Sequence, residues 1–446
     1  MIVRVPSPVN RAVAPPVGRK HTRRVVAASM VGTVIETYDL YIYGTAAALV
    51  FSTVFFPDMD PATALIFSFL TFAASFVARP VGAIVLGHFG DRIGRKAILI
   101  LSLLIMGIGT FLIAFLPGFE TIGPAAPIIL IVLRICQGIG FGGEWGGAIT
   151  MVTEHAPPGR RAFFASLPQL GSPIGFILAN AIFLALIAAM PNEAFMSWGW
   201  RIPFFLSILL VALGFYIRKR VDETPQFKEM VAKKEQVRMP FFEVLRRPSG
   251  FILVTGSTIF MFGTFYLVAT FMLSYLTNSV GLDRDTALLT VLIASVFQLI
   301  SIPTFGALAA KVGGTRLMIA AAVGVAIWAF PLLALIDTGN FVLVTVAFSV
   351  FMILHSMIYG PMGAIFPALF HTSSRYTGLS MGLNFGSLIG GGFAPLIAVQ
   401  LPNGHSVAVF LFVLALVSLG FIIGVFYKMR NNDRGFAALS GDANDA

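Results

Sequence analysis

Charged side chains are rare inside the long apolar segments of this sequence, so those that occur there are candidates for chemistry. Glu36 and Asp39 lie within the apolar segment 25–51, and Arg134 and Glu144 lie within the apolar segment 125–151. Ionisable groups inside a hydrocarbon layer are costly, and they usually face a partner or a water-filled cavity. The sequence therefore predicts a buried polar centre that binds protons and a small anion.

The polar residues of these two segments recur at helical spacing. The first run is Gly32, Glu36, Asp39 and Tyr43, and the second is Arg134, Gln137, Phe141 and Glu144. Steps of three and four residues place side chains on one face of a helix. We therefore expect two helices that turn stripes of opposite charge toward a common cavity.

A proton-linked carboxylate beside a substrate-binding arginine would couple two bound species. Burial favours the neutral carboxyl and a nearby arginine favours the carboxylate, so an anion that occupies the arginine can change the proton occupancy of the acid. Arginine suits an anionic substrate because its planar fork binds a carboxylate through two hydrogen bonds. The alternative is a permanent ion-pair network that only locks the helices. The sequence does not identify which acid carries the proton.

Further polar residues lie on segments that we expect to line a transport pathway. They are Gln137, Gln169, Tyr266, Gln298, Tyr359 and Asn384. Their side chains could hydrogen-bond hydroxyl or keto groups of a substrate, although each could equally serve packing between helices. His355 lies in the apolar segment 341–366. We include it in the candidate site, with a packed, hydrogen-bonded imidazole as the favoured role.

A second group of residues is a candidate gate. It comprises Arg79, Gly90, Asp91, Arg92, Gly94, Arg95, Glu154, Arg161 and Arg375. Asp91, Arg92 and Arg95 are expected in a tight glycine-flanked turn, where they would form a salt-bridge lattice with Glu154 and Arg161. Exposed pairs contribute only about 0–1 kcal/mol each. A gating role therefore requires a network that breaks when the two halves of the molecule rock.

Composition identifies the solvent that surrounds these elements. Of the 446 residues, 57% are hydrophobic and 11% are charged, whereas soluble domains carry about 25% charged residues. Apolar stretches of about 20 residues recur along the chain, and each is long enough to cross a bilayer as a helix. Soluble enzymes, nucleic-acid binders and secreted scaffolds are thereby excluded. Apparent nucleotide-binding and hydrolase glycine motifs fall inside predicted membrane helices, so we expect no enzyme activity.

The hydropathy pattern predicts an all-α membrane protein with twelve transmembrane helices in two six-helix bundles. The predicted spans are 25–51, 63–87, 97–117, 125–151, 163–187, 202–220, 249–277, 286–309, 317–336, 341–366, 378–399 and 406–428. The first bundle then covers residues 25–220 and the second covers 249–428. A disordered tail over 1–24, a central loop over 221–248 and a second tail over 429–446 complete the predicted organisation.

The basic residues set the orientation of these spans. The net charge is +10, and 26 of the 30 Lys and Arg residues fall in alternate connections between apolar segments. Basic residues mark the cytoplasmic side, so we expect both termini and the central loop in the cytoplasm. The charge therefore reflects topology and not affinity for nucleic acid. Cys136 is the sole cysteine, so no intramolecular disulfide can form.

The two halves contain a weak internal repeat. GHFGDRIGRKAIL at 87–99 follows the second span, and GALAAKVGGTRLMI at 306–319 follows the eighth. Repeated halves are typical of alternating-access transporters, in which the substrate site lies between the halves near the middle of the membrane.

Several longer motifs resemble the major facilitator superfamily, and within it the metabolite:proton symporter family. The most specific are GTVIETYDLYIYG at 32–44, FVARPVGAIVLGHFGDRIGRK at 76–96 and LRICQGIGFGGEWGGA at 133–148. The resemblance implies twelve helices, alternating access, and proton-driven uptake of a small polar metabolite across a bacterial inner membrane. It places Glu36, Asp39, Arg134 and Glu144 in the buried polar centre, and residues 87–96 in the gating loop.

The sequence departs from the family pattern at four points. Thr37 replaces the usual tryptophan of the first span, which could alter the cavity lining. In the second half, Ala310 and Ala368 replace two acidic residues, and Gly313-Gly314 replaces a Gly-Arg pair. The departures imply an asymmetric inward gate held mainly by residues of the first half.

We expect a proton-coupled symporter of a small organic anion, with shikimate-like or keto-acid substrates favoured. Counting Glu36, Asp39 and Glu144 against Arg79 and Arg134 gives the centre a charge of −1 when all are ionised. Protonating two acids gives +1, which suits a monocarboxylate. A proton-coupled proline or betaine symporter, a passive facilitator and a non-transporting sensor or scaffold remain alternatives. No cofactor beyond the proton gradient is expected, and the protein is expected to act as a monomer.

Overall fold

The computed structural model describes residues 19–93, 95–142, 144, 149, 152, 161–219, 240–370 and 375–431. Every regular element in these ranges is helical. In the first half the long helices are α1 (Arg19–Ala46), α3 (Pro61–Ile93), α4 (Arg95–Ile113), α6 (Ala125–Gly142), α9 (Gly171–Ala189) and α11 (Ile202–Lys219). In the second half they are α14 (Ser249–Tyr266), α16 (Arg284–Val312), α17 (Gly314–Ile336), α18 (Phe341–Ile365), α19 (Arg375–Gly386) and α21 (Gly404–Asn431).

Short elements extend or connect these helices. In the first half they are η1 (Ala47–Phe51), α2 (Ser52–Phe55), α5 (Phe119–Ile122), α8 (Arg161–Ser166), η2 (Pro168–Leu170), α10 (Asn192–Ser197) and η3 (Gly199–Arg201). In the second half they are α13 (Pro240–Arg246), η4 (Leu267–Phe271), α15 (Met272–Asn278), η5 (Phe366–Leu369), η6 (Ser387–Gly392) and α20 (Phe393–Val399).

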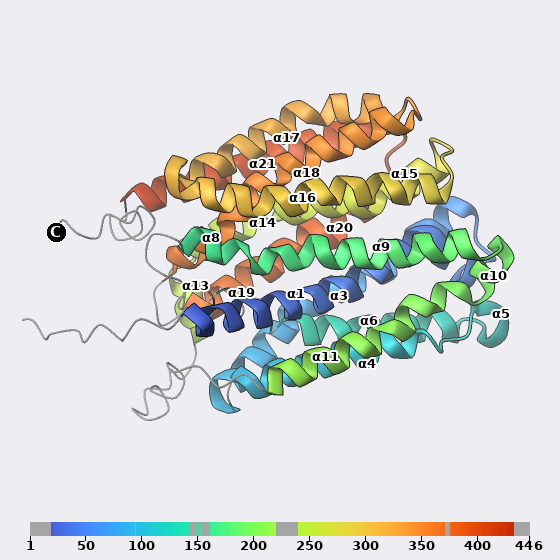
Figure 1. The fold of residues 1–446 in the computed structure, drawn as a ribbon, viewed down its shortest axis with the longest axis horizontal. Helices are drawn as coiled ribbons and strands as arrows, with labels where there is room; N and C mark the ends of the chain where they lie inside the picture. The colour runs from blue at the N-terminus through green and yellow to red at the C-terminus, as the bar shows by residue number, and fades with distance from the viewer. Residues whose placement is uncertain are drawn as a thin grey trace, which may run out of the picture.

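The long helices have the length and the apolar composition of membrane-spanning helices. Ten helical stretches of the described chain are long and apolar enough to cross a bilayer, and α4 contributes a shorter apolar stretch, Ile100–Ile113. With α1, which carries the acids of the candidate site, these make the twelve predicted helices, and they run side by side in Figure 1. Large apolar side chains such as Leu209 and Ile327 remain exposed on the outside, as lipid contact requires. The all-α, multi-pass prediction is confirmed.

The two halves meet along the middle of the molecule. Figure 1 shows α16, α17, α18 and α21 on one side, α1, α3, α4, α6 and α11 on the other, and α9 between them. Contacts join α9 to both α1 and α16, and join α3 to α19, η6 and α20. We call the end that holds α8 and the start of α1 the α8 end, and the opposite one the α10 end.

Three long helices contain a π-helical turn. These turns are η1 after α1, η4 after α14 and η6 after α19. The turns η1 and η4 occupy corresponding places, because α1 and α14 are the first long helices of their halves. A Cβ at Gly44, just before η1, would lie 3.3 Å from the side chain of Thr270 in η4. The two turns are therefore close neighbours across the interface between the halves.

Two predicted boundaries differ from the structure. Helix α1 begins at Arg19, so the end of the expected tail is already helical. Helix α3 continues through Gly90, Asp91 and Arg92 to Ile93, and α4 begins at Arg95. The expected tight turn at 91–95 is therefore replaced by two helix ends separated by one residue.

Candidate substrate and proton site

A polar cavity of about 230 Å³ lies inside the first half, between α1, α3, α4 and α6. Its charged lining consists of Glu36, Asp39, Arg79 and Arg134, and Gln137 is beside them. The predicted stripes on α1 and α6 thus meet at this cavity. We call it the inner-half cavity.

A chain of hydrogen bonds fixes Arg134 in the inner-half cavity. Its Nη1 donates to Oε1 of Gln137 at 2.8 Å, and Nε2 of Gln137 donates to Oγ1 of Thr110 on α4 at 2.7 Å. The guanidinium also lies 3.9 Å from the ring centroid of Tyr43, an attractive cation–π geometry. The Nε and Nη2 atoms of Arg134 are buried and have no hydrogen-bond partner among the described residues. Part of this cation is therefore available to a ligand or water.

Asp39 is the second notable group of this cavity. Its side chain is 4% exposed, and neither carboxylate oxygen accepts a hydrogen bond from a described residue. Buried polar groups are normally satisfied by protein or by water. Since Asp39 shares the inner-half cavity with two arginines, it is placed to exchange a proton and to respond to charge at those arginines.

Arg79 is held in a different way, by two aromatic rings. Its Cζ lies 3.8 Å from the ring centroid of Phe76 and 3.6 Å from that of Phe141. Its three nitrogens are buried without a hydrogen-bond partner in the described chain. We expected Arg79 in the gate, but the structure places it in the cavity wall. A guanidinium held between two rings is pre-organised for a planar anion.

A larger cavity of about 410 Å³ lies between the two halves, and we call it the interface cavity. The first half contributes Glu36, Thr37, Leu40, Tyr41, Phe141 and Ser172 to its wall. The second half contributes Met261, Phe262, Phe265, Tyr266, Gln298, His355 and Tyr359. Glu36, Leu40 and Phe141 line both cavities. They form a thin partition between the candidate proton site and the interface between the halves.

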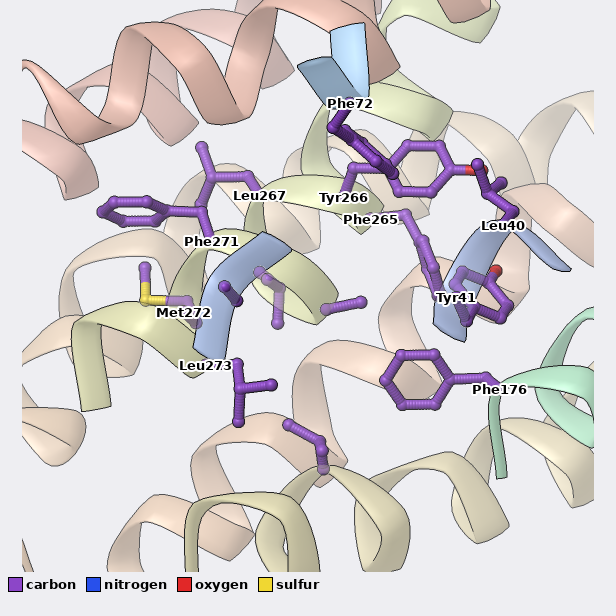
Figure 2. Packing of buried hydrophobic residues seen from close by; sticks show 14 of the residues in the cluster. Leu40, Tyr41, Phe72, Phe176, Phe265, Tyr266, Leu267, Phe271, Met272 and Leu273 are labelled. Carbon is purple, nitrogen blue, oxygen red and sulfur yellow. The ribbon is translucent and has the colours of Figure 1, made fainter. Parts of the chain in front are cut away.

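Aromatic residues of both halves pack together beside the interface cavity, as Figure 2 shows around Tyr41. The Tyr41 ring lies 4.8 Å from Phe176 of its own half and 6.0 Å from Phe265 of the other half. Its hydroxyl shares a 2.8 Å hydrogen bond with Ser172. The rings of Phe72 and Tyr266 also meet across the interface, at 5.9 Å. These contacts join the two halves beside the cavity.

His355 and Gln298 lie together in the second-half wall. Nδ1 of His355 is 3.3 Å from Nε2 of Gln298, and Nε2 of His355 is 3.0 Å from the carbonyl oxygen of Met261. The imidazole is packed and hydrogen-bonded. Tyr266 and Tyr359, also candidates from the sequence, line the same cavity.

Three other candidates lie outside the described linings of both cavities. Helix α6 ends at Gly142, so Glu144 falls in a turn where helical spacing no longer applies. Its Oε2 accepts a 3.5 Å hydrogen bond from Oγ of Ser102 on α4. Gln169 is buried in η2. Asn384 donates to the carbonyl of Gly142 at 3.2 Å and so ties α19 to the end of α6.

The candidate gate lies mostly outside what the structure describes. Gly94 and Glu154 are not among the described residues. For Gly90, Asp91, Arg92, Arg95, Arg161 and Arg375, the structure describes the backbone helix alone. The salt-bridge lattice remains a prediction.

Two cavity residues were not expected from the sequence. Thr110 relays the hydrogen bonds that hold Arg134, and Ser172 anchors Tyr41. Hydroxyl residues are common in membrane helices, where they often bond to their own helix backbone. Without a charge or a motif, nothing in the sequence distinguished these two from the others.

Comparison with known proteins identifies the family. The model of the Major Facilitator Superfamily matches residues 27–381. The inner membrane metabolite transport protein YhjE of Escherichia coli (strain K12) is 42% identical over 90% of this chain and 92% of its own. The shikimate transporter of the same strain is 38% identical over 89% and 92%, and its proline/betaine transporter is 32% identical over 92% and 84%.

Solved structures agree on the fold. A crystal structure of a D-xylose-proton symporter superposes with a TM-score of 0.72 at 17% identity, covering 91% of this chain and 97% of that chain. Similarity at this level of identity shows the fold alone. Together with the sequence relatives, it shows that the protein is a multi-pass membrane transporter and not an enzyme. The chain belongs to the major facilitator superfamily.

Proposed function

We propose that this transporter is a proton-coupled symporter of a small organic anion, driven by the proton gradient without a cofactor. The observation that carries the proposal is the buried carboxylate of Asp39, which shares a cavity with Arg79 and Arg134. Relatives that transport metabolites and a relative that transports shikimate support a small carboxylate as substrate. We place the protein in a bacterial inner membrane, where the name of its relative YhjE places that protein. Both termini would lie in the cytoplasm, as the basic loops indicate.

The charge of the inner-half cavity supports a monocarboxylate. Because Glu144 lies elsewhere, the count is two acids, Glu36 and Asp39, against two arginines, Arg79 and Arg134. The fully ionised cavity is neutral, and one proton gives it a charge of +1. A bound monocarboxylate then restores neutrality.

Neutrality explains how the two bound species would be coupled. Moving an uncompensated charge into a medium of low dielectric constant costs several kcal/mol. The empty cavity and the cavity loaded with one proton and one anion are both neutral, whereas the half-loaded states carry net charge. The halves would therefore exchange between outward and inward access mainly when empty or fully loaded, which is the requirement for symport.

Arg79 is our candidate for the carboxylate anchor. Its ring partners hold it in place, and Tyr266 and Glu36 are its polar neighbours. Phe141, one of those rings, lines both cavities. An anion that enters the interface cavity would bind the arginine once side chains of the partition move aside.

An osmolyte symporter is the second candidate. The proline/betaine transporter of Escherichia coli (strain K12) is 32% identical to this chain, and Tyr41, Tyr266 and Tyr359 line the interface cavity. Aromatic faces attract quaternary and secondary ammonium groups. The two arginines of the inner-half cavity, however, repel the cation of such a substrate.

Uptake into proteoliposomes tests these candidates. The purified protein would be given radiolabelled shikimate, α-ketoglutarate, citrate, proline or betaine under an inward proton gradient, with and without a protonophore. We expect accumulation of a hydroxy or keto acid that the protonophore abolishes. Accumulation of betaine or proline alone would support the osmolyte alternative. Equilibration of a substrate that does not depend on the proton gradient would identify a facilitator.

A further inference from the structure

The second-half wall of the interface cavity contains a hydrogen-bond acceptor whose direction is fixed by its neighbours. We propose that Gln298, oriented by His355, accepts a hydrogen bond from a substrate hydroxyl and thereby selects hydroxylated monocarboxylates. The inference rests on the proposed function, because it names the substrate class of the same transport site. It makes Gln298 a specificity residue and His355 a positioning residue.

The orientation begins at a backbone carbonyl. Nε2 of His355 lies 3.0 Å from the carbonyl oxygen of Met261, and a carbonyl can only accept. The ring proton must therefore be on Nε2, which makes Nδ1 of the neutral imidazole an acceptor. Nε2 of Gln298, at 3.3 Å from Nδ1, must be the donor. This order of donors and acceptors follows from the Met261 carbonyl and not from a choice of amide orientation.

The other end of the amide is left without a partner. Gln298 is 1% exposed, it lines the interface cavity, and its Oε1 has no hydrogen-bond partner among the described residues. Rotating the amide would place Oε1 against the Nδ1 lone pair of His355, which is repulsive. A buried carbonyl oxygen that cannot turn away requires a donor. A substrate O–H supplies one.

Packing holds the positioning residue in place. The His355 ring lies 5.2 Å from Phe265, 5.6 Å from Tyr359 and 6.0 Å from Phe351. These rings leave the imidazole no room for a second rotamer without displacing a neighbour. Packing within the second half therefore fixes the direction of the Gln298 side-chain carbonyl.

The two sides of the site have different chemistry. Arginines lie behind the first-half wall, whereas the described second-half lining contains no Arg, Lys, Asp or Glu. A monocarboxylate with hydroxyl groups at its far end fits both sides. A second carboxylate would meet the Gln298 oxygen, which repels it. The site therefore favours a hydroxylated monocarboxylate over a dicarboxylate or an unhydroxylated amino acid.

A matched pair of acids tests the proposal. Shikimate and cyclohex-1-ene-1-carboxylate share the ring and the carboxylate, but only shikimate has hydroxyl groups. We would measure the KM of each in proteoliposomes for the wild type, Gln298→Leu and the isosteric Gln298→Met. We expect both variants to reduce the preference for shikimate about tenfold, through its KM, and to leave the KM of the unhydroxylated acid unchanged.

Two further variants separate positioning from folding. His355→Leu should reduce the preference for shikimate as much as Gln298→Leu does. His355→Gln should retain most of that preference, because a glutamine can still donate to Met261 and accept from Gln298. Ser295→Ala is the matched control, because the Ser295 hydroxyl donates to Val291 in the same helix α16 and lies outside the cavity. A shikimate preference that is unchanged in both Gln298 variants would overturn the assignment. A wild type that accumulates neither acid would overturn the proposed function itself.

Discussion

The charged residues of the site differ in how the protein holds them, and this difference has consequences for substitution. Arg134 is fixed by a hydrogen bond to Gln137, whereas Arg79 is fixed by the rings of Phe76 and Phe141. A lysine would keep the charge of Arg79 but lose the planar group that fits between two rings and binds a carboxylate at two points.

Arg79→Lys should therefore impair transport although charge is conserved. Hydrogen bonds to charged groups contribute about 1.5–3 kcal/mol each, so loss of one raises the substrate KM by roughly tenfold or more. Uptake kinetics in proteoliposomes measure the effect. Arg201→Lys is the control, because Arg201 stacks on Trp200 and donates to backbone carbonyls away from both cavities. Wild-type kinetics in Arg79→Lys would contradict its role as anchor.

The helices position these residues through glycine contacts between α3 and α6. A Cβ at Gly138 would overlap the carbonyl oxygen of Ser75, and one at Gly142 would overlap that of Arg79. Small residues at such a crossing let two membrane helices approach closely. The approach brings Arg79 on α3 and Arg134 on α6 to one cavity.

Gly138→Ala should force α3 and α6 apart and destabilise the protein. Overpacking of a close contact costs about 1–3 kcal/mol, and here the obstacle is backbone. Thermal unfolding in detergent should show a lower midpoint than for Gly420→Ala, because a Cβ at Gly420 meets nothing within 4 Å. Equal midpoints for the two variants would show that the glycine crossing tolerates a methyl group.

The sequence predicted the helices well because a bilayer imposes length and hydropathy on each span. It predicted the site in part, since Glu36, Asp39 and Arg134 stand out against an apolar background and keep helical spacing. Glu144 was misplaced on the predicted stripe because α6 ends two residues earlier, at Gly142. The π-helical turns could not be foreseen, because AALVF at 47–51 is ordinary apolar sequence and its geometry depends on neighbouring helices.

At the scale of the whole molecule, described hydrogen bonds tie the two halves near both ends. Asn384 of α19 donates to the Gly142 carbonyl near the α8 end, and Arg284 of α16 donates to Asn192 at the α10 end, at 2.9 Å. Rocking of the halves must break one tie while the other persists. The interface cavity lies between the two.

Asn384→Ala should favour opening at the α8 end. Ser166, fully buried against Gly306 of α16, reports this opening. In a Cys136→Ser background, Ser166→Cys should react several-fold faster with a soluble maleimide when Asn384→Ala is also present. Asn278→Ala, which removes an amide bonded to Ser274 in its own helix, is the control. Equal labelling rates would mean that the Asn384 bond does not restrain the halves.

In the proposed mechanism Asp39 carries the coupled proton, and the variant Asp39→Asn tests this role. In proteoliposomes that accumulate a carboxylate under a proton gradient, the variant should retain counterflow exchange of that substrate, because exchange needs no net proton movement. It should lose accumulation against a gradient. Retained proton-driven accumulation in Asp39→Asn, at equal amounts of reconstituted protein, would contradict the account.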